Sequence, residues 1–343
     1  MTCLHSIRLI CSLAFLAFAR TGIAQENNKS EDFSAYMDEV RTVNKYILEE
    51  QIKGRKTYES VLTPEGLAVQ RMKLDNANST FKPVLKPAVM RIGSGDASVE
   101  LRIFRPKEIR AIILDIHGGA WFMGSAANDD ETNDQMARQC KAVVVSLDDG
   151  LAPEHPFPDC IRDSYAGIRW LLTHALAQFG TEKIILSGAS AGAHLAALAA
   201  IYTRDSLHAI DKIAGLNLVY GVYDLGKPPS VRNATDNQFP SKSDLDETYK
   251  LVFPGWDSAK LREPAYSPLF ADLKGLPPAL FTTGTADPLV DNTYLMESRW
   301  RQAGNKTWLA LYPECPHGFN LFPTKIGQLA NERMIKWIND ILQ

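Results

Sequence analysis

The chain has 343 residues, of which 45% are apolar and 22% charged, with 22 Gly, 19 Pro and 5 Cys. These proportions describe a globular protein and exclude a coiled coil, a collagen-like chain and a disulfide-rich miniprotein. The formal net charge is −3, and no block of lysines and arginines is interleaved with aromatic residues. Nucleic acid is therefore not an expected partner.

The first 24 residues have the pattern of a secretory signal peptide. A short basic region ends at Arg8, and an apolar run follows over 9–19. The sequence Gly22-Ile23-Ala24 then places small residues where a signal peptidase requires them. A membrane anchor is the alternative interpretation, but an apolar run of about 11 residues is shorter than the ~20 needed to span a bilayer. We expect cleavage near Ala24 and a secreted or periplasmic protein without a stable membrane anchor.

Cysteine spacing gives no indication of a metal site. Cleavage after Ala24 would leave Cys140, Cys160 and Cys315, which lack the CxxC spacing of a zinc site. At most one disulfide can form among three cysteines, and the sequence leaves open whether it does. No metal and no cofactor are expected.

Hydrophobic patterning predicts an α/β fold. Apolar residues at helical spacing over 33–47 predict an N-terminal helix, and further helices are predicted after Pro158 and over 330–341. Short apolar runs predict parallel strands buried on both faces, at 99–104, 111–116, 142–147, 183–186, 216–220, 279–283 and 308–312. Alternating elements of this kind form a mostly parallel, doubly wound sheet.

The domain organisation follows from where this alternation is interrupted. Residues 25–90 form an N-terminal lead-in or cap segment, and 91–343 form the catalytic domain. The interval 222–270, with a helix predicted near 244–252, is too long for an ordinary connection between strands. We expect this insertion and the N-terminal segment to form a helical cap over the carboxyl ends of the strands.

The strongest local motif is Gly188-Ala189-Ser190-Ala191-Gly192, which lies between a predicted strand and a predicted helix. A serine flanked by glycines on such a turn is a nucleophile elbow, because the glycines permit the tight turn that exposes the serine oxygen. Ser190 is therefore the candidate nucleophile. The amide of Ala191, at the start of the helix, is a candidate donor to an oxyanion.

A second motif, His117-Gly118-Gly119-Ala120-Trp121, directly follows another predicted strand. Consecutive glycines allow backbone amides to turn towards a substrate, so Gly118 and Gly119 are candidate oxyanion-hole donors together with Ala191. A glycine-rich turn that merely connects two elements is the alternative. His117 is interpreted as holding the loop, and Trp121 is a candidate substrate-binding residue.

A nucleophilic serine needs a base and an orienting carboxylate. His317 and Asp287 follow the last two predicted strands, and the chain order Ser190, Asp287, His317 is that of an α/β-hydrolase. Asp291 and Glu314 are rival carboxylates, and Asp287 is preferred because it lies immediately beyond a strand. His194, one turn into the helix after the elbow, is interpreted as a packing residue.

Taken together, these motifs resemble the hormone-sensitive-lipase-like branch of the α/β-hydrolases, the bacterial family IV esterases. The resemblance covers roughly residues 95–340. It is carried in order by the HGG loop, the LAPE-x-x-FP segment at 151–158, the Ser190 elbow, the DPLxD motif at 287–291 and the HGF motif at 317–319. It implies an α/β-hydrolase fold and cofactor-free hydrolysis of carboxylic esters beneath a cap.

The chain departs from this family's pattern in three places. Asp148-Asp149-Gly150 replaces the usual Asp-Tyr-Arg before LAPE, so the charge pairing that the arginine supports must be rearranged. The elbow lacks the aspartate of GDSAGG and is closer to the GxSAGxH elbow of carbohydrate acetyl- and feruloyl-type esterases. The segment 25–90 contains no recognisable motif.

The sequence thus predicts a serine carboxylesterase that hydrolyses short-acyl or small esters through an acyl-enzyme, with a small-molecule ester as its partner. A carbohydrate esterase of the acetylxylan or feruloyl type, an amidase or arylformamidase, and a non-catalytic binding protein on the same fold remain alternatives. The acyl and alcohol parts of the substrate and the oligomeric state are left open.

Overall fold

The computed structural model describes residues 32–343 except 56–59, 79–80 and 96–97, together with the backbone but not the side chains of 51–55 and 76–78. The predicted signal peptide, residues 1–24, lies outside the described residues. Residues 36–343 pack as one unit. None of the helices in the described ranges combines the length and apolar character needed to cross a bilayer.

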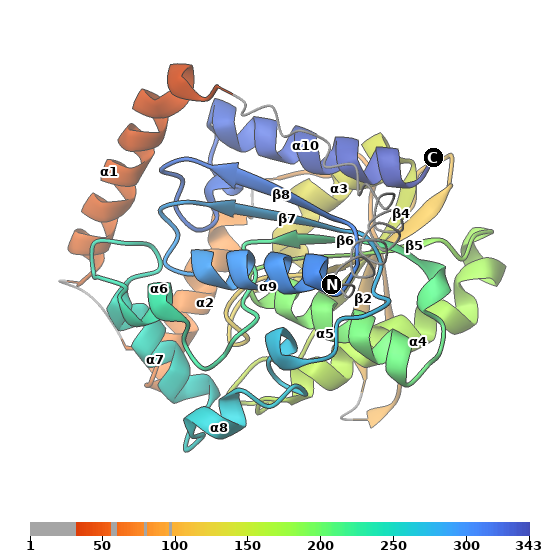
Figure 1. Cartoon of the computed structure of the whole chain (residues 1–343), viewed down its shortest axis with the longest axis horizontal. Coiled ribbons are helices and arrows are strands. Elements are labelled where there is room, and N and C mark those ends of the chain that lie inside the picture. Colours follow the sequence, from red (N-terminus) through yellow and green to blue (C-terminus); the bar gives the residue numbers. More distant parts are fainter. Residues whose placement is uncertain (1–31, 56–59, 79–80, 96–97) are drawn as a thin grey trace, which may run out of the picture. The chain divides into compact units, whose positions relative to one another are not determined.

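A mixed sheet of eight strands organises the described residues, in the order β1-β2-β4-β3-β5-β6-β7-β8 (Figure 1). The strands are β1 (Ala88–Ile92), β2 (Val99–Phe104), β3 (Ala111–Ile116), β4 (Ala142–Asp148), β5 (Ile184–Ala189), β6 (Ile213–Val219), β7 (Ala279–Gly284) and β8 (Thr307–Tyr312). Strand β2 is antiparallel to both β1 and β4, whereas all pairings among β3 to β8 are parallel. The predicted mostly parallel sheet is confirmed.

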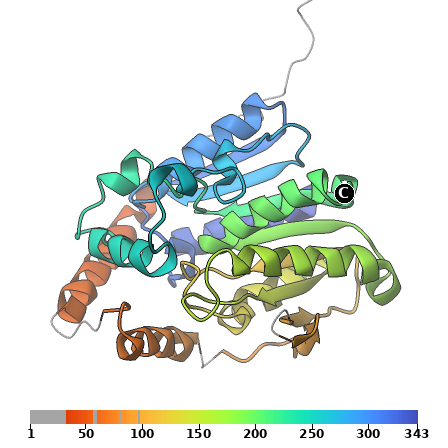
Figure 2. The same ribbon diagram turned by 90° about the horizontal axis from the view of Figure 1, so that it is seen from below.

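Helices cover both faces of the sheet (Figures 1 and 2). Helices α4 (Asp159–Phe179), α5 (Ala191–Asp205) and α9 (Val290–Gln302) cover one face, and α3 (Asp130–Cys140) and α10 (Lys325–Ile341) cover the other. Right-handed crossovers between parallel strands require helices on both faces, and this arrangement brings the carboxyl ends of β3 to β8 to one edge.

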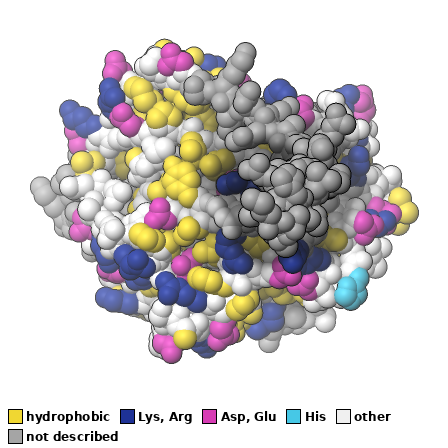
Figure 3. Space-filling view, in the orientation of Figure 1, with side chains coloured by type: hydrophobic (Ala, Val, Ile, Leu, Met, Phe, Trp, Pro, Cys, Tyr) yellow, Lys and Arg dark blue, Asp and Glu magenta, His cyan; other side chains and the backbone are white. Residues whose placement is uncertain are grey.

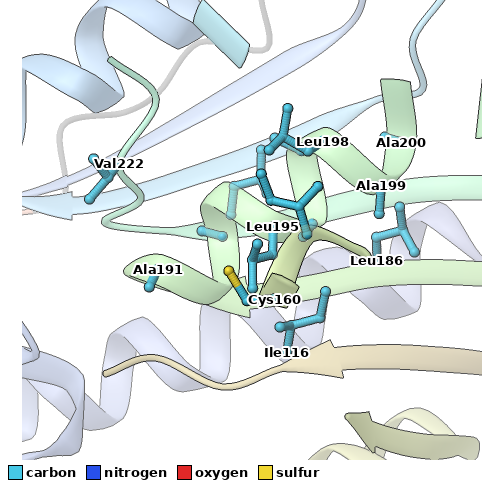
Figure 4. Packing of buried hydrophobic residues seen from close by; sticks show 14 of the residues in the cluster. Ile116, Cys160, Leu186, Ala191, Leu195, Leu198, Ala199, Ala200 and Val222 are labelled. Atoms are coloured by element: carbon cyan, nitrogen blue, oxygen red, sulfur yellow. The ribbon is translucent and has the colours of Figure 1, made fainter. Parts of the chain in front are cut away.

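The core explains why the central strands read as continuous apolar runs. Every residue of β3 is buried, and all but the last residue of β4 and of β5 are buried. Figure 4 shows Leu195 and Leu198 of α5 packed near Ile116 and Leu186 of the sheet. Helix α5 can lie close to β3 because Gly192 has no side chain. A Cβ at this position would lie only 1.9 Å from the carbonyl oxygen of Ile116.

Five further helices of the described residues lie beyond the carboxyl ends of the strands (Figure 1). They are α1 (Met37–Arg55) and α2 (Pro64–Asn78) from the N-terminal segment, and α6 (Pro229–Arg232), α7 (Lys242–Val252) and α8 (Ser258–Leu261) from the interval 222–270. Helix α7 begins with a reciprocal capping box between Ser241 and Asp244. On the face shown in Figure 3, charged side chains of both signs are interspersed with apolar ones.

Strand β1 was not predicted, because its residues do not alternate. Its exposure changes from exposed at Ala88 to buried only at Ile92, as expected of an edge strand with a single neighbour. The N-terminal helix was predicted over 33–47, but the α-helix runs from Met37 to Arg55. Its charged second half has no apolar face that a sequence pattern could detect.

Candidate active site

Ser190 occupies a strained turn between β5 and α5. Its backbone has φ 56° and ψ −118°, a conformation that L-residues adopt only when the surroundings enforce it. The flanking glycines make the turn possible, since a Cβ on Gly188 would lie 2.4 Å from the carbonyl carbon of Gly192. The Ser190 amide donates to the carbonyl of Val219 on β6 at 2.9 Å, which fixes the elbow to the sheet.

The structure brings together the three residues predicted from their order in the chain. His317 Nε2 lies 3.0 Å from Ser190 Oγ, and His317 Nδ1 lies 2.7 Å from Asp287 Oδ2. Asp287 is 1% exposed, and its second oxygen accepts the amide of Leu289 at 2.7 Å. A hydroxyl, an imidazole and a buried carboxylate in this sequence can pass a proton from the serine to the histidine.

The rival carboxylates have other partners. Asp291 lies at the start of α9, where its Oδ2 accepts the amide of Ser230 at 2.8 Å. Glu314 forms a bidentate pair with Arg41 of α1, with distances of 2.8 and 2.9 Å. Neither carboxylate contacts His317, so the geometry favours Asp287 as the orienting acid.

The glycine loop after β3 lies beside the elbow. A Cβ on Gly118 would be 3.1 Å from the carbonyl oxygen of Ala189 and 3.5 Å from Ser190 Cβ. The carbonyl of Gly119 accepts the amides of Phe122 and Met123, which closes the loop. In the described part of the chain, no acceptor occupies the amides of Gly118, Gly119 or Ala191, so all three are available to a substrate oxygen.

His117 holds this loop, as its position in the motif indicated. Its Nδ1 lies 2.6 Å from the carbonyl of Gly118, and its Nε2 lies 3.3 Å from Asp149, outside hydrogen-bonding geometry. Burial alone would lower the pKa of His117, but the charges of Asp149, Asp129 and Asp148 and the Gly118 carbonyl raise it. Burial raises the pKa of Asp149 to about 7. Asp149 occupies the position where the related family has tyrosine.

Trp121, the candidate substrate-binding residue, lines the cavity but is only 5% exposed. Its indole nitrogen donates to His194 Nδ1 at 3.2 Å, and His194 Nε2 lies 2.6 Å from the carbonyl of Tyr266. The rings of Phe157 and Phe253 pack edge-on against the indole. His194 is therefore a buried neutral residue that positions Trp121 rather than a second base.

His194 should contribute a pH-dependent part of the stability. Burial lowers the pKa of His194 from 6.5 to about 4, so below pH 6.5 the unfolded chain binds a proton that the folded chain excludes, and stability falls as the pH drops. The full difference corresponds to about 3 kcal/mol. We expect the Tm of His194→Gln to approach that of the wild type between pH 7 and pH 4.5.

The quantity to follow is the difference in Tm between His194→Gln and the wild type at each pH. Burial raises the pKa values of Asp115 and Asp149 to about 7, so these two groups stabilise the folded state as the pH falls. Both proteins contain these two groups, so their effect cancels. The exposed His174 provides the matched control His174→Gln, whose Tm should follow that of the wild type. A Tm difference for His194→Gln that stays constant with pH would contradict the assignment.

A cavity of about 1230 Å³ opens above Ser190. One part is mainly apolar and is lined by residues of the N-terminal segment and of the interval 222–270: Val61, Leu74, Phe239, Leu245 and Tyr249. Another part is polar and extends between the sheet and helices α3 and α10. In the described residues no group of three or more His, Cys, Asp or Glu side chains is arranged to hold a metal ion.

The cysteines lie in the core. Cys140, Cys160 and Cys315 are free and buried, so no disulfide forms among them. Cys315, two residues before His317, is 0% exposed and does not line the cavity. Burial raises the pKa of its thiol to about 12, which makes it unreactive at neutral pH.

Arg71 of α2 is a site-supporting residue that the motifs did not identify. Its guanidinium makes two hydrogen bonds to Glu154, both of 2.9 Å, and one of 2.8 Å to each of the carbonyls of Phe122 and Ala152. It therefore links helix α2 to the glycine loop and to the LAPE segment. The only signal in the sequence was Gly150, which stands where the related family has arginine and indicated that the charge pairing of that arginine must be rearranged.

Removing this guanidinium should destabilise the fold. Arg71→Ala removes four charge-assisted hydrogen bonds. Loss of one hydrogen bond to a charged group typically lowers the free energy of unfolding by about 1.5–3 kcal/mol. The pair of Arg41 and Glu314 provides the matched control Arg41→Ala, which should lower the free energy of unfolding much less, because solvent screens an exposed ion pair. Urea unfolding of both variants measures the difference. Equal losses would show that Arg71 is an ordinary surface ion pair.

Comparison with known proteins agrees with this geometry. A model of the alpha/beta hydrolase fold matches residues 113–321, and the chain belongs to this family. It is 30% identical over 283 residues to the carboxylesterase NlhH of Mycobacterium tuberculosis, which covers 78% of this chain and 86% of that protein. It is also 30% identical over 231 residues to an arylesterase of Saccharolobus solfataricus, covering 66% and 74% of the two chains.

Solved structures support the same conclusion. An esterase of Pyrobaculum calidifontis superimposes with a TM-score of 0.74 at 27% identity, covering 80% of this chain and 93% of that one. A hormone-sensitive lipase from a metagenome library superimposes with a TM-score of 0.72 at 26% identity, covering 88% and 98%. The resemblance to hormone-sensitive-lipase-like esterases and the predicted fold are confirmed.

Proposed function

We propose that this protein is a serine carboxylesterase that hydrolyses small or short-acyl esters through an acyl-enzyme. The observation that carries the proposal is the chain of contacts from Ser190 Oγ through His317 to Asp287, of 3.0 and 2.7 Å, beside three unoccupied amides. The relatives named as esterases and carboxylesterases support the same class of reaction.

In the first half-reaction, Ser190 Oγ attacks the ester carbonyl carbon while His317 Nε2 takes its proton. Negative charge then develops on the former carbonyl oxygen, and the amides of Gly118, Gly119 and Ala191 donate to it. The protonated imidazole is stabilised by Asp287 and returns its proton to the alcohol oxygen as the C–O bond breaks. Acyl-Ser190 and the free alcohol result.

In the second half-reaction, water replaces the alcohol. His317 takes a proton from the water as it attacks the acyl carbon, and the same three amides stabilise the second oxyanion. The proton then passes to Ser190 Oγ, which releases the carboxylic acid. The side chains lining the apolar part of the cavity are compatible with a short acyl chain.

The test is covalent labelling combined with an ester panel. A fluorophosphonate probe should label the purified protein, and peptide mass spectrometry should locate the label on Ser190. p-Nitrophenyl esters from acetate to dodecanoate should show the highest kcat/KM at acyl chains of two to six carbons. An unlabelled protein that hydrolyses none of these esters would indicate a binding protein instead.

The alternatives share the same catalytic residues and differ in leaving group. Release of acetate from acetylated xylan at a rate comparable with p-nitrophenyl acetate would favour a carbohydrate esterase. Faster hydrolysis of an aryl amide or N-formyl aniline than of the matching ester would favour an amidase or arylformamidase.

We also propose that the protein is exported after cleavage near Ala24. The support is the basic, apolar and small-residue pattern of the first 24 residues. Cell fractionation with N-terminal mass determination tests this proposal. A protein in the cytoplasmic fraction that retains residues 1–24 would contradict it.

A further inference from the structure

A row of polar side chains crosses the sheet directly below the catalytic serine. Ser146 of β4, Asp115 of β3, Ser187 of β5 and Asn217 of β6 are register neighbours on four adjacent strands. Register neighbours lie on the same face of a sheet, and each of these residues is at most 5% exposed. Such positions under helices are normally apolar, so the row requires an explanation.

The row does not satisfy its own hydrogen-bonding capacity. Ser146 donates to Asp115 at 3.4 Å, and the amide nitrogen of Asn217 donates to Ser187 at 3.3 Å. The amide oxygen of Asn217 has no hydrogen-bond partner, although the residue is only 3% exposed. An unpaired buried acceptor costs free energy unless another molecule supplies a donor.

This part of the structure is hollow and continuous with the catalytic cavity. Asp115, Ser187 and Asn217 line the same cavity as Ser190 and His317. Asp129, which precedes α3, and Tyr220, which follows β6, also line it. We call the space bounded by Asp115, Asp129, Ser187, Asn217 and Tyr220 the polar recess.

The polar recess adjoins the wall of the cavity that contacts the candidate base, His317. The ring of Tyr220 packs on the ring of His317 with centroids 4.6 Å apart, and the Tyr220 hydroxyl donates to Asn320 at 2.8 Å. Besides burial, the charge of Asp129 raises the pKa of Tyr220, which places Asp129 near the same ring. Because His317 protonates the departing alcohol, the alcohol part of the ester leaves beside this wall.

The chemistry of the polar recess favours hydroxyl groups. Its side chains carry two carboxyls, two hydroxyls and one amide, and Arg138 and Lys325 line other parts of the same cavity. Burial raises the pKa of Asp115 to about 7 and that of Asp129 above its usual range. A carboxyl such as Asp115, with a pKa of about 7, can both donate and accept hydrogen bonds near neutral pH, which matches a hydroxyl better than a cation.

We propose that the polar recess binds the alcohol part of an ester substrate when that part carries hydroxyl groups. The enzyme then prefers a hydroxylated alcohol to an alkyl alcohol of the same size and shape. This proposal rests on the proposed esterase function, and it assigns to that function a substrate class that the catalytic residues alone do not define.

The test compares two acetates of matched shape. In 2,3-dihydroxypropyl acetate, two hydroxyls stand where 2-methylbutyl acetate has two methyl groups, and acetate release measures both reactions. We expect kcat/KM of the wild type to be at least 10-fold higher for the dihydroxy ester. Asn217→Leu and Asp129→Ala should each reduce this ratio at least 5-fold, whereas Asn233→Leu, an exposed residue outside the cavity, should leave it unchanged.

Stability separates a ligand-binding role from a structural one. Asn217→Leu removes an unpaired buried acceptor together with one long hydrogen bond to Ser187, so its Tm should stay close to that of the wild type. A lower Tm with an unchanged substrate ratio would assign Asn217 to the fold and overturn the proposal. Asp129 is partly exposed, so Asp129→Ala provides a second measurement that does not depend on packing under the helices.

The remaining outcomes are distinguishable. If the wild type hydrolyses 2-methylbutyl acetate as fast as the dihydroxy ester or faster, the polar recess proposal fails and the esterase function stands. If it hydrolyses neither these esters nor p-nitrophenyl acetate, the esterase function itself fails. A preference for cations is measured as the ratio of kcat/KM for acetylcholine to that for its neutral isostere, 3,3-dimethylbutyl acetate. If this ratio exceeds the ratio for the dihydroxy ester over 2-methylbutyl acetate, the proposal is also overturned.

Discussion

Replacing Ser190 with alanine is expected to lower kcat for p-nitrophenyl acetate about 10⁶-fold, because the acyl-enzyme can no longer form. A residual rate about 10³–10⁴-fold above that in water should remain, since the amides of Gly118, Gly119 and Ala191 can still stabilise an oxyanion. KM should change little. Stopped assays at high enzyme concentration measure the residual activity, and the fluorophosphonate label should disappear.

The companion variant Asp287→Asn tests whether the triad works as one unit. Asp287 accepts from His317 Nδ1 and also from the amide of Leu289, so asparagine keeps the shape but favours the wrong imidazole tautomer. We expect kcat to fall about 10⁴-fold with Tm nearly unchanged. Asp291→Asn is the matched control outside the triad. A larger loss in Asp291→Asn than in Asp287→Asn would reassign the acid.

The proximity of Ser190, Asp287 and His317 could be predicted because the local sequence defines where these candidate residues lie. The glycines at 188 and 192 identify the turn that exposes Ser190, and the apolar runs before 287 and 317 place the acid and the base at the ends of neighbouring strands. In a parallel sheet these ends meet at one edge. Chain order alone therefore predicts a proximity that separations of 127 and 30 residues conceal.

The supporting residues could not be predicted, because their partners are defined only by the fold. Arg71 lies 83 residues from Glu154, in a helix whose sequence carries no motif. The row of Asp115, Ser187 and Asn217 depends on the register between β3, β5 and β6. In the sequence, each of these three residues is a single polar interruption of an apolar strand, so none of them indicates a common cavity.

The absence of a Cβ at Gly119 should be as necessary to the rate as an oxyanion donor. Gly119 has φ +120°, and a Cβ there would lie 1.8 Å from the carbonyl oxygen of Met123. Gly119→Ala must therefore rearrange the turn that the Gly119 carbonyl closes with the amides of Phe122 and Met123. Because this turn directs the loop amides, we expect kcat to fall about 10²–10³-fold, the cost of losing one donor.

Gly275→Ala is the matched control for the backbone cost alone. Gly275 has φ +70° and nothing within 4 Å of a Cβ, so alanine there carries the penalty of a left-handed residue, about 1–2 kcal/mol of stability, without a clash. It should therefore lower Tm with kcat near that of the wild type. If Gly119→Ala retained wild-type kcat, the donors would have to lie elsewhere. If Gly119→Ala lost activity only through unfolding, its Tm and kcat would fall together. A folded Gly119→Ala protein with a low kcat and a little-changed KM would instead show that the loop acts on the transition state.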